Sequence, residues 1–287
     1  MFDPKTDKYP YPEETDHHYL KVKKNDGTIF DKDYPYIDNS KSFKRKQKLT
    51  RLLLNTIVFP LSYIRMGLKI KGKENLKKHK EELDKGVISI CNHVHMWDYI
   101  GIMNAVKYRK TNLLVWAPNV SGELGGMVRM VGGIPIPEHD PQATLAYLNT
   151  IENLLNNGGW LQIYPEGSMW EYYYPIRPFK RGSAYFACRF DKPILPLAYS
   201  YRKPGWIRRI IFKQIALFTL TIGEPLYQNK DLPKEEREID LLKRCHNEVC
   251  RLAGINPKDN LYPPIFNNSK RVDYYTEIYG VNYKGSK

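Results

Sequence analysis

The fold is decided by the stretch Val87-Ile88-Ser89-Ile90-Cys91, which runs directly into Asn92-His93-Val94-His95-Met96-Trp97-Asp98. The first five residues form a short apolar run of the kind found in buried strands, and a helix is expected from residue 98 onward. His93 precedes Asp98 by five residues, so one turn of chain folds the carboxylate back onto the imidazole. A carboxylate placed there holds one tautomer of the ring and stabilises the imidazolium. The stretch therefore predicts a strand end that carries a general base.

Outward from this stretch, short apolar runs alternate with helical patterns. This alternation predicts an α/β fold, as a single domain with a mostly parallel central sheet flanked by helices. In such sheets the functional groups gather at the carboxyl ends of the strands. The predicted strands are residues 87–91, 112–117, 160–164, 193–199 and 215–222, and the predicted helices are residues 98–109, 122–131, 140–157, 181–190 and 234–253.

A second turn of interest follows the predicted strand 160–164. It reads Tyr164-Pro165-Glu166-Gly167-Ser168, and a Pro-Glu-Gly turn taken alone is commonly a surface turn whose glutamate points to water. Because this turn ends a strand expected to lie near the His93 strand, we favour a role in organising substrate. Backbone N–H groups near Gly167 and Ser168 are candidate donors to a developing oxyanion.

Positive charge is concentrated in the N-terminal part of the chain. The formal net charge of +14 favours an anionic partner, such as a phospholipid surface, a nucleic acid or a phosphorylated substrate. Residues 41–80 contain thirteen Lys or Arg against the single acid Glu74, and they enclose the apolar stretch from Leu52 to Ile64. This pattern favours an amphipathic helix lying in the headgroup layer, and a core-packing helix with a solvated basic flank is the alternative. The apolar stretch is shorter than the ~20 residues that cross a bilayer.

Four regions are expected along the chain. They are an extended or partly disordered arm (1–40), a basic amphipathic membrane-associating segment (41–80), a catalytic domain (81–260) and a peripheral C-terminal tail (261–287). The first forty residues contain no apolar core of a cleavable signal, and the four cysteines show no Cys-x-x-Cys spacing. We therefore expect a protein at the cytoplasmic face of the cell membrane, either peripheral or monotopic.

Four blocks, in this order, resemble the glycerolipid and lysophospholipid acyltransferase family. Asn92 to Asp98 resembles its HX4D motif and Gly132-Gly133-Ile134-Pro135-Ile136 its second block, while Tyr164 to Ser168 resembles its Phe-Pro-Glu-Gly-Thr-like third block. The stretch Lys192-Pro193-Ile194-Leu195-Pro196-Leu197 resembles the fourth. The resemblance covers roughly residues 50 to 225 and implies a lysophosphatidate acyltransferase-like fold.

The resemblance also implies the chemistry. His93 would take the proton from an acceptor hydroxyl as that hydroxyl attacks a thioester carbonyl, and Asp98 would hold the imidazole. The donor substrate would be acyl-CoA or acyl-carrier protein, without a cofactor, and Glu166 would help to bind the acceptor. The residues expected to bind substrate are Asn92, Glu166, Gly167, Ser168, Arg177, Lys180 and Arg181.

Two positions depart from the family pattern. Members that use a phosphorylated acceptor usually carry an arginine after the second block and another after the third, but here the chain continues as Pro137-Glu138-His139 and as Met169-Trp170-Glu171. The segment from Arg177 to Arg181 is the expected substitute, because it carries cations and opens a predicted helix. The aromatic run from Trp170 to Tyr174 suits sugars, aliphatic chains or the lipid interface, and loop packing is the alternative. The expected acceptor is a lysophospholipid, namely lysophosphatidate, and a glycolipid or polysaccharide is the alternative.

Two other function classes stay open. The triplet His93-Val94-His95 with Asp98 resembles two-histidine metal sites, which would make a metal-dependent hydrolase, but the other histidines lack metal-site spacing. An inactive basic membrane-binding module with the same fold is the last alternative. No nucleic-acid-binding motif accompanies the charge, so we expect no nucleic-acid partner. The histidines without metal-site spacing, outside the triplet His93-Val94-His95, are His17, His18, His79, His139 and His246.

Overall fold

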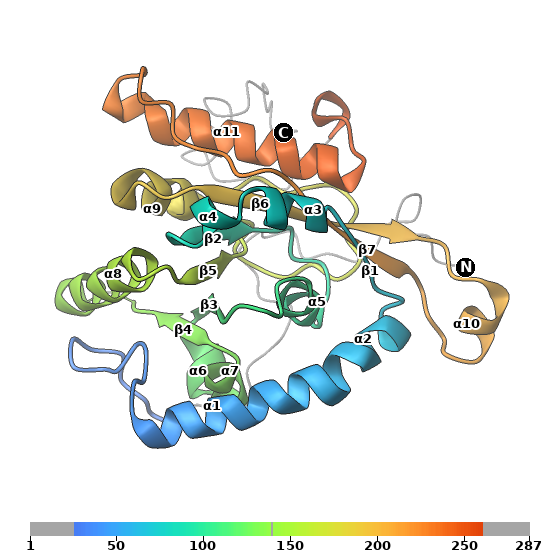
Figure 1. Ribbon diagram of the computed structural model, residues 1–287, viewed down its shortest axis with the longest axis horizontal. Helices are drawn as coiled ribbons and strands as arrows, with labels where there is room; N and C mark the ends of the chain where they lie inside the picture. Colours follow the sequence, from blue (N-terminus) through green and yellow to red (C-terminus); the bar gives the residue numbers. More distant parts are fainter. Residues whose placement is uncertain (1–25, 139, 261–287) are drawn as a thin grey trace, which may run out of the picture.

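One seven-stranded sheet, in the order β1-β7-β6-β2-β5-β3-β4, organises the chain (Figure 1). The computed structural model describes residues 26–138 and 140–260. All neighbouring strands are parallel except β6 and β7, which are antiparallel. The predicted α/β class with a mostly parallel sheet is therefore confirmed. The strands are β1 (Lys69–Lys71), β2 (Val87–Ile90), β3 (Thr111–Trp116), β4 (Gly133–Ile136), β5 (Trp160–Ile163), β6 (Ile194–Arg202) and β7 (Leu217–Ile222).

Helices cover both faces of this sheet (Figure 1). The helices of the described residues are α1 (Lys41–Leu53), a π-helical turn (Leu54–Val58), α2 (Phe59–Arg65), α3 (Lys73–Lys78), α4 (Lys80–Leu83), α5 (Asp98–Ala105), α6 (Pro118–Ser121), α7 (Gly125–Met130), α8 (Pro141–Asn156), α9 (Gly182–Phe190), α10 (Trp206–Ile210) and α11 (Lys234–Ala253), followed by a 3-10 turn (Pro257–Asp259).

The central strands β2 and β5 are buried on both faces. Successive side chains of a strand point to opposite faces, so Ile88 and Ile90 pack with α8, α9 and α11, while Val87 packs with α2 and α5. The polar groups inside these strands satisfy one another: Ser89 Oγ donates to Gln162 Oε1 at 2.5 Å and accepts from Trp160 Nε1 at 2.7 Å. This packing brings the carboxyl ends of β2 and β5 side by side, and the site lies there.

Several elements differ from their predicted form. The predicted helix 122–131 is shorter in the structure, where α7 covers only Gly125–Met130 and a separate short helix, α6, ends before it at Ser121. The predicted helix 98–109 ends at Ala105. The sheet also contains β1 and β4, which the sequence patterns did not indicate. Both are edge strands, and β4 contains Pro135, which an edge strand tolerates because one of its sides needs no ladder hydrogen bond.

The apolar stretch Leu52 to Ile64 belongs to one helical segment that runs from Lys41 to Arg65. A π-helical turn interrupts it just before Pro60, where Phe59 N–H donates to Leu54 O. Proline lacks an N–H and its ring clashes with the preceding turn, so a wider turn accommodates it. Within the described residues, no helix combines the length and apolarity that crossing a bilayer requires.

Residues 1–25, His139 and residues 261–287 lie outside the described residues. Most of the predicted N-terminal arm, the predicted C-terminal tail, and the histidines His17 and His18 therefore lie there as well.

Candidate active site

His93 and Asp98 meet where β2 ends and α5 begins. His93 Nδ1 lies 2.7 Å from Asp98 Oδ2. The same oxygen accepts the backbone N–H of Val94 at 3.1 Å, and Asp98 is buried while His93 stays partly exposed. A carboxylate that accepts the Nδ1 proton leaves Nε2 of the neutral ring as a proton acceptor. The pair thus has the geometry of a general base and its orienting acid.

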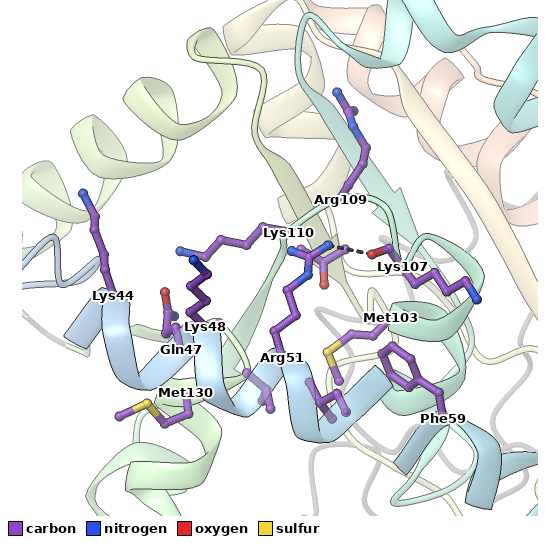
Figure 2. A pocket seen from close by; sticks show the side chains of 14 residues that line it. Lys44, Gln47, Lys48, Arg51, Phe59, Met103, Lys107, Arg109, Lys110 and Met130 are labelled. Carbon is purple, nitrogen blue, oxygen red and sulfur yellow. Dashed lines mark hydrogen bonds between the residues drawn. The ribbon is translucent and has the colours of Figure 1, made fainter. Parts of the chain in front are cut away.

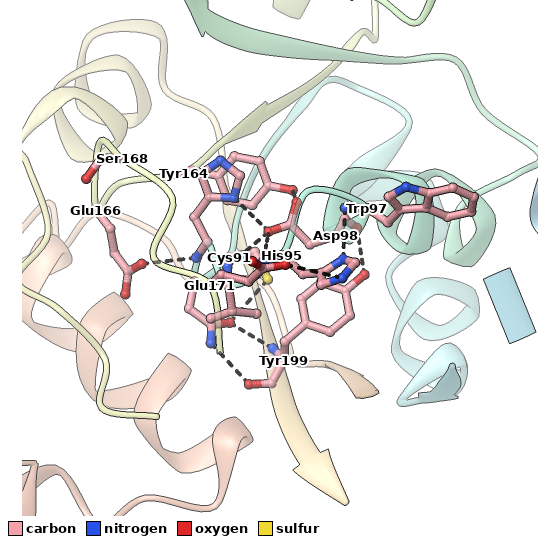
Figure 3. Close-up of polar contacts among 12 residues, drawn as sticks. Cys91, His95, Trp97, Asp98, Tyr164, Glu166, Ser168, Glu171 and Tyr199 are labelled. Carbon is pink, nitrogen blue, oxygen red and sulfur yellow. Dashed lines mark hydrogen bonds and ion pairs between the residues drawn. The ribbon is translucent and has the colours of Figure 1, made fainter. Parts of the chain in front are cut away.

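Tyr164, at the end of β5, completes the surroundings of this pair (Figure 3). Its hydroxyl donates to Asp98 Oδ1 at 2.6 Å, and its ring stacks on that of His93 with centroids 4.0 Å apart. Burial, together with the negative charge of Asp98, raises the pKa of Tyr164 well above its usual range, so the hydroxyl keeps its proton and stays a donor. Tyr164 therefore holds both members of the pair in place.

The turn after β5 is held by a buried ion pair. Glu166 Oε2 lies 2.9 Å from Arg177 Nη2, and both side chains are almost fully buried. Glu166 Oε2 also accepts the backbone N–H of His93 at 3.0 Å. Glu166 thus connects the turn after β5 directly to the backbone of the predicted base.

The Arg177 side chain makes further contacts within the protein. Its Nη1 donates to Ser168 Oγ at 2.9 Å, its Nη2 donates to the Ser168 carbonyl, and the guanidinium lies 4.6 Å from the centroid of the Trp170 ring. Of the predicted substrate-binding residues, Glu166, Ser168 and Arg177 therefore form one internal cluster that fixes the turn behind His93. Arg177 therefore makes these contacts inside the protein, whereas the sequence analysis expected it to bind the substrate.

The tip of the turn requires a glycine. Gly167 has φ +84°, and a Cβ at this position would lie 2.7 Å from Lys180 Cε. The Gly167 N–H donates to Tyr164 O at 3.0 Å, so this amide closes the turn and is not a donor to an oxyanion. Lys180 is exposed, and its side chain lies against the turn.

The remaining predicted residues lie around this cluster. Asn92 is buried and bonds the backbone of Tyr199 on β6, accepting from its N–H at 2.8 Å and donating to its carbonyl at 3.1 Å. Its amide therefore extends the pairing of β2 with β6. Arg181 forms an ion pair with Glu238 of α11 at 2.9 Å.

His95 differs from His93 although only one residue separates them. Its Nδ1 accepts the backbone N–H of Trp97 at 3.0 Å, and its ring packs against Phe218. Burial lowers the pKa of His95 to about 4, so the ring is neutral at pH 7. In the part of the chain that the structure describes, no group of three or more His, Cys, Asp or Glu residues is placed to hold a metal ion.

The aromatic run after the turn closes over the end of β2. Trp170 N–H donates to His93 O and Tyr172 N–H donates to Val94 O, at 3.0 and 2.9 Å. Trp170 is buried against Tyr173. For Trp170 and Tyr173 the structure supports loop packing, which the sequence analysis gives as the alternative to ligand or lipid contact.

The residue that the sequence analysis missed is Tyr164, whose hydroxyl reaches Asp98. A signal was present: the resembling family carries phenylalanine at this place in its third block, and tyrosine here adds a hydroxyl at a strand end. The bond itself depends on β2 and β5 being neighbours in the sheet. The sequences of the two strands do not reveal this pairing.

Comparisons with known proteins bear on this cluster. A family model described as "Acyltransferase" matches residues 67–200, a segment that contains His93, Asp98 and Glu166. No curated protein matches the sequence. Among solved structures, the chain is similar to the 1-acyl-sn-glycerophosphate (LPA) acyltransferase PlsC from Thermotoga maritima, with 21% identity, a TM-score of 0.47, and coverage of 76% of this chain and 82% of that one.

Proposed function

We propose, from the premise that residues 67–200 belong to the acyltransferase family, that this acyltransferase moves a fatty acyl group from a thioester donor to the hydroxyl of a lysophospholipid. The observation that carries the proposal is the 2.7 Å contact between His93 Nδ1 and Asp98 Oδ2 at the end of β2. A base so oriented serves direct transfer, because a thiolate leaves readily and no covalent acyl-enzyme is needed.

In the proposed reaction, His93 Nε2 accepts the proton of the acceptor hydroxyl while the hydroxyl oxygen bonds to the thioester carbonyl carbon. The carbon–sulfur bond then breaks, and the proton held by His93 passes to the departing thiolate. Asp98 stabilises the imidazolium in between, and Tyr164 keeps Asp98 in position through the 2.6 Å hydrogen bond.

The acceptor we propose first is lysophosphatidate. Of the three cations expected to bind its phosphate, Lys180 lies against the 166–168 turn with an exposed side chain, and an ammonium at that place suits a phosphate monoester. A neutral hydroxyl acceptor, such as a glycolipid or polysaccharide, is the second candidate. The observation in its favour is that Arg177 is buried in an ion pair with Glu166 and Arg181 is paired with Glu238.

We further propose that the reaction takes place at the cytoplasmic face of a membrane. Apolar side chains of α1, the π-helical turn and α2, including Leu52, Leu53 and Ile57, are exposed between basic residues, as in helices that lie in the headgroup layer. A second exposed apolar element supports this proposal. It is α10 in the β6–β7 hairpin with the residues that follow it, and its exposed side chains are Trp206, Ile207, Ile210, Ile211 and Phe212.

The two apolar elements are joined. Gln214 Nε2 donates to the carbonyls of Ile64 and Arg65, and Arg208 Nη1 donates to the Ile64 carbonyl at 3.1 Å, so the hairpin is tied to the end of α2 (Figure 1). We call the exposed apolar side chains of α1, the π-helical turn, α2, α10 and residues 211–212 the apolar ledge. Its many large apolar side chains and its basic rim support contact with anionic lipid.

A thiol-release assay tests the function. The full chain is incubated with acyl-CoA or acyl-carrier protein and with lysophosphatidate, lysophosphatidylcholine, monoacylglycerol or a glycolipid, and the products are identified by mass spectrometry. We expect thiol release that depends on the acceptor and is fastest with lysophosphatidate. A faster reaction with a neutral acceptor would favour the second candidate, and release without any acceptor would replace the transferase proposal with thioester hydrolysis.

A further inference from the structure

A cavity of about 380 Å³ lies between α1 and the loop that connects α5 to β3 (Figure 2). Neither His93 nor Asp98 lines it. Helix α5 connects the two places, because it begins at Asp98 and its Met103, near the other end, lines the cavity. The cavity is therefore a separate feature at the far end of α5.

The cavity is lined by cations. Lys44, Lys48 and Arg51 come from one side of α1, at the spacing of neighbours along a helix face, and Lys107, Arg109 and Lys110 come from the opposite loop. No acidic side chain is among the described residues that line it. Such a cluster attracts an anion strongly.

Only part of this charge is balanced within the protein. Arg109 forms an ion pair with Asp84 at 2.5 Å, and Arg51 Nη2 donates to the Lys107 carbonyl at 2.6 Å. Within residues 26–138 and 140–260, no carboxylate forms an ion pair with Lys44, Lys48 or Lys110. Three ammonium groups of the lining therefore have no carboxylate counter-charge among the residues that the structure describes.

Lys110 is affected by the neighbouring cations. Its side chain is exposed, and partial desolvation together with the charges of Lys44 and Arg51 lowers its pKa. Like charges placed close together destabilise one another, and an anion placed among them relieves this repulsion.

The rest of the lining is apolar. Leu54, Phe59, Met103, Met130 and Val131 line the cavity together with the cations. An inorganic phosphate would satisfy the ammonium groups and leave this apolar part unused. An amphiphile with an anionic head and a hydrocarbon chain uses both parts.

We propose that this cavity binds the phosphate headgroup of an anionic membrane lipid, with the first carbons of the lipid against Phe59, Met103 and Met130. The position of the cavity supports a lipid as the occupant. At 100° per residue, Leu49 and Leu53 lie on another side of α1 from Lys44 and Lys48, and both leucines are exposed in the apolar ledge. One helix thus borders the cavity on one side and carries part of the surface proposed to meet the bilayer on another.

Isothermal titration calorimetry with the full chain tests the proposal. The probes are dioctanoyl phosphatidylglycerol below its micelle concentration, dioctanoyl phosphatidylcholine and inorganic phosphate. We expect one phosphatidylglycerol per chain, with phosphate and phosphatidylcholine each binding at least tenfold more weakly. Phosphate binding as tightly as phosphatidylglycerol would overturn the lipid assignment, and the absence of saturable binding by phosphatidylglycerol would overturn the site.

Three variants that each remove one lysine charge locate the bound lipid. Lys48→Met and Lys110→Met should each weaken phosphatidylglycerol binding at least tenfold, which corresponds to about 1.4 kcal/mol. Lys46→Met is the matched control, because Lys46 is an exposed lysine of α1 that does not line the cavity, and it should keep the affinity within twofold. Equal losses in all three variants would mean attraction by surface charge alone.

His93→Ala separates this site from the acyl-transfer centre. The variant should bind phosphatidylglycerol as the unaltered chain does, because His93 does not line the cavity. Weaker binding by His93→Ala would place the lipid at His93 and overturn the proposal. Since no acyl donor is present, the result is independent of whether acyl transfer takes place.

Discussion

The carboxyl ends of β2 and β5 differ from the apolar ledge in where their side chains find partners. At the strand ends, Asp98 accepts from His93, Val94 and Tyr164, and Glu166 accepts from His93 and Arg177. Along the ledge, large apolar side chains face outward. Buried polar groups must find partners inside the protein, whereas an exposed apolar surface of this size indicates a partner outside it.

The difference has a consequence for function. The groups at the strand ends are held by several contacts each, so the base has one orientation before any substrate arrives. The ledge side chains are apolar and exposed, so we expect them to act by contact with a lipid surface. Changes at the strand ends should therefore alter turnover, folding stability or both, while changes on the ledge should alter attachment.

The largest expected effect concerns His93. Replacing it with alanine removes the proposed base, and the rate of acyl transfer should fall by about 10²- to 10⁴-fold. The thermal unfolding midpoint should change little, because the ring is partly exposed. Thiol release under saturating donor and acceptor measures the rate. An unchanged rate would remove His93 from the mechanism and weaken the contrast between the two regions.

Next in size is the loss of the buried ion pair. Arg177→Met leaves the Glu166 carboxylate buried without its cation, and such a change costs about 3–5 kcal/mol of unfolding free energy. Arg181→Met is the matched control, since it breaks an ion pair of the same type whose arginine side chain is 52% exposed against 3% for Arg177. The control should cost about 0–1 kcal/mol. Urea unfolding measures both, and equal losses would contradict the internal role given to Arg177.

The third effect is a loss of stability in acid. Burial lowers the pKa of both His95 and His246 to about 4, below the ordinary value of about 6.5. Between pH 6.5 and 4 the unfolded chain binds a proton at each histidine that the folded chain does not, so stability is complete above pH 6.5 and falls as the pH decreases. Each group contributes roughly 3 kcal/mol to this loss, at about 1.4 kcal/mol per pH unit.

His95→Gln isolates the contribution of one of these histidines. The variant should lose stability less steeply than the unaltered chain between pH 6.5 and 4, whatever its stability at pH 7. Urea unfolding at several pH values gives the two slopes. Identical slopes would mean that His95 is protonated in the folded protein, against its buried setting beside Phe218.

How far the sequence predicted the molecule depends on the separation of the residues in the chain. His93 and Asp98 are five residues apart, so their contact follows from local structure alone. The contacts from Tyr164 to Asp98 and from Arg177 to Glu166 depend on which strands are neighbours and on the course of the loop after β5. Residue spacing contains no such information, so the sequence predicts a substrate contact for Arg177, whereas the structure pairs it with Glu166.

The ledge shows the same limit. The basic, apolar segment around Leu52 is long enough to give a pattern, and it forms the predicted helix. Helix α10 has five residues, too few for a helical repeat to be recognised. Its place beside α2 depends on the bonds from Gln214 and Arg208 to the end of that helix, which join segments about 150 residues apart.

The smallest expected effect tests the ledge itself. Leu52 on α1 and Leu145 on α8 have nearly the same exposure, 59% and 57%, and only Leu52 belongs to the ledge. Removing an apolar side chain that enters the lipid costs up to about 1.5–3 kcal/mol when it is fully buried, so Leu52→Ser should weaken binding to phosphatidylglycerol-containing vesicles several-fold. Leu145→Ser should leave it unchanged. Co-sedimentation measures both, and equal behaviour would show that exposure alone, without the position beside α2 and α10, determines attachment.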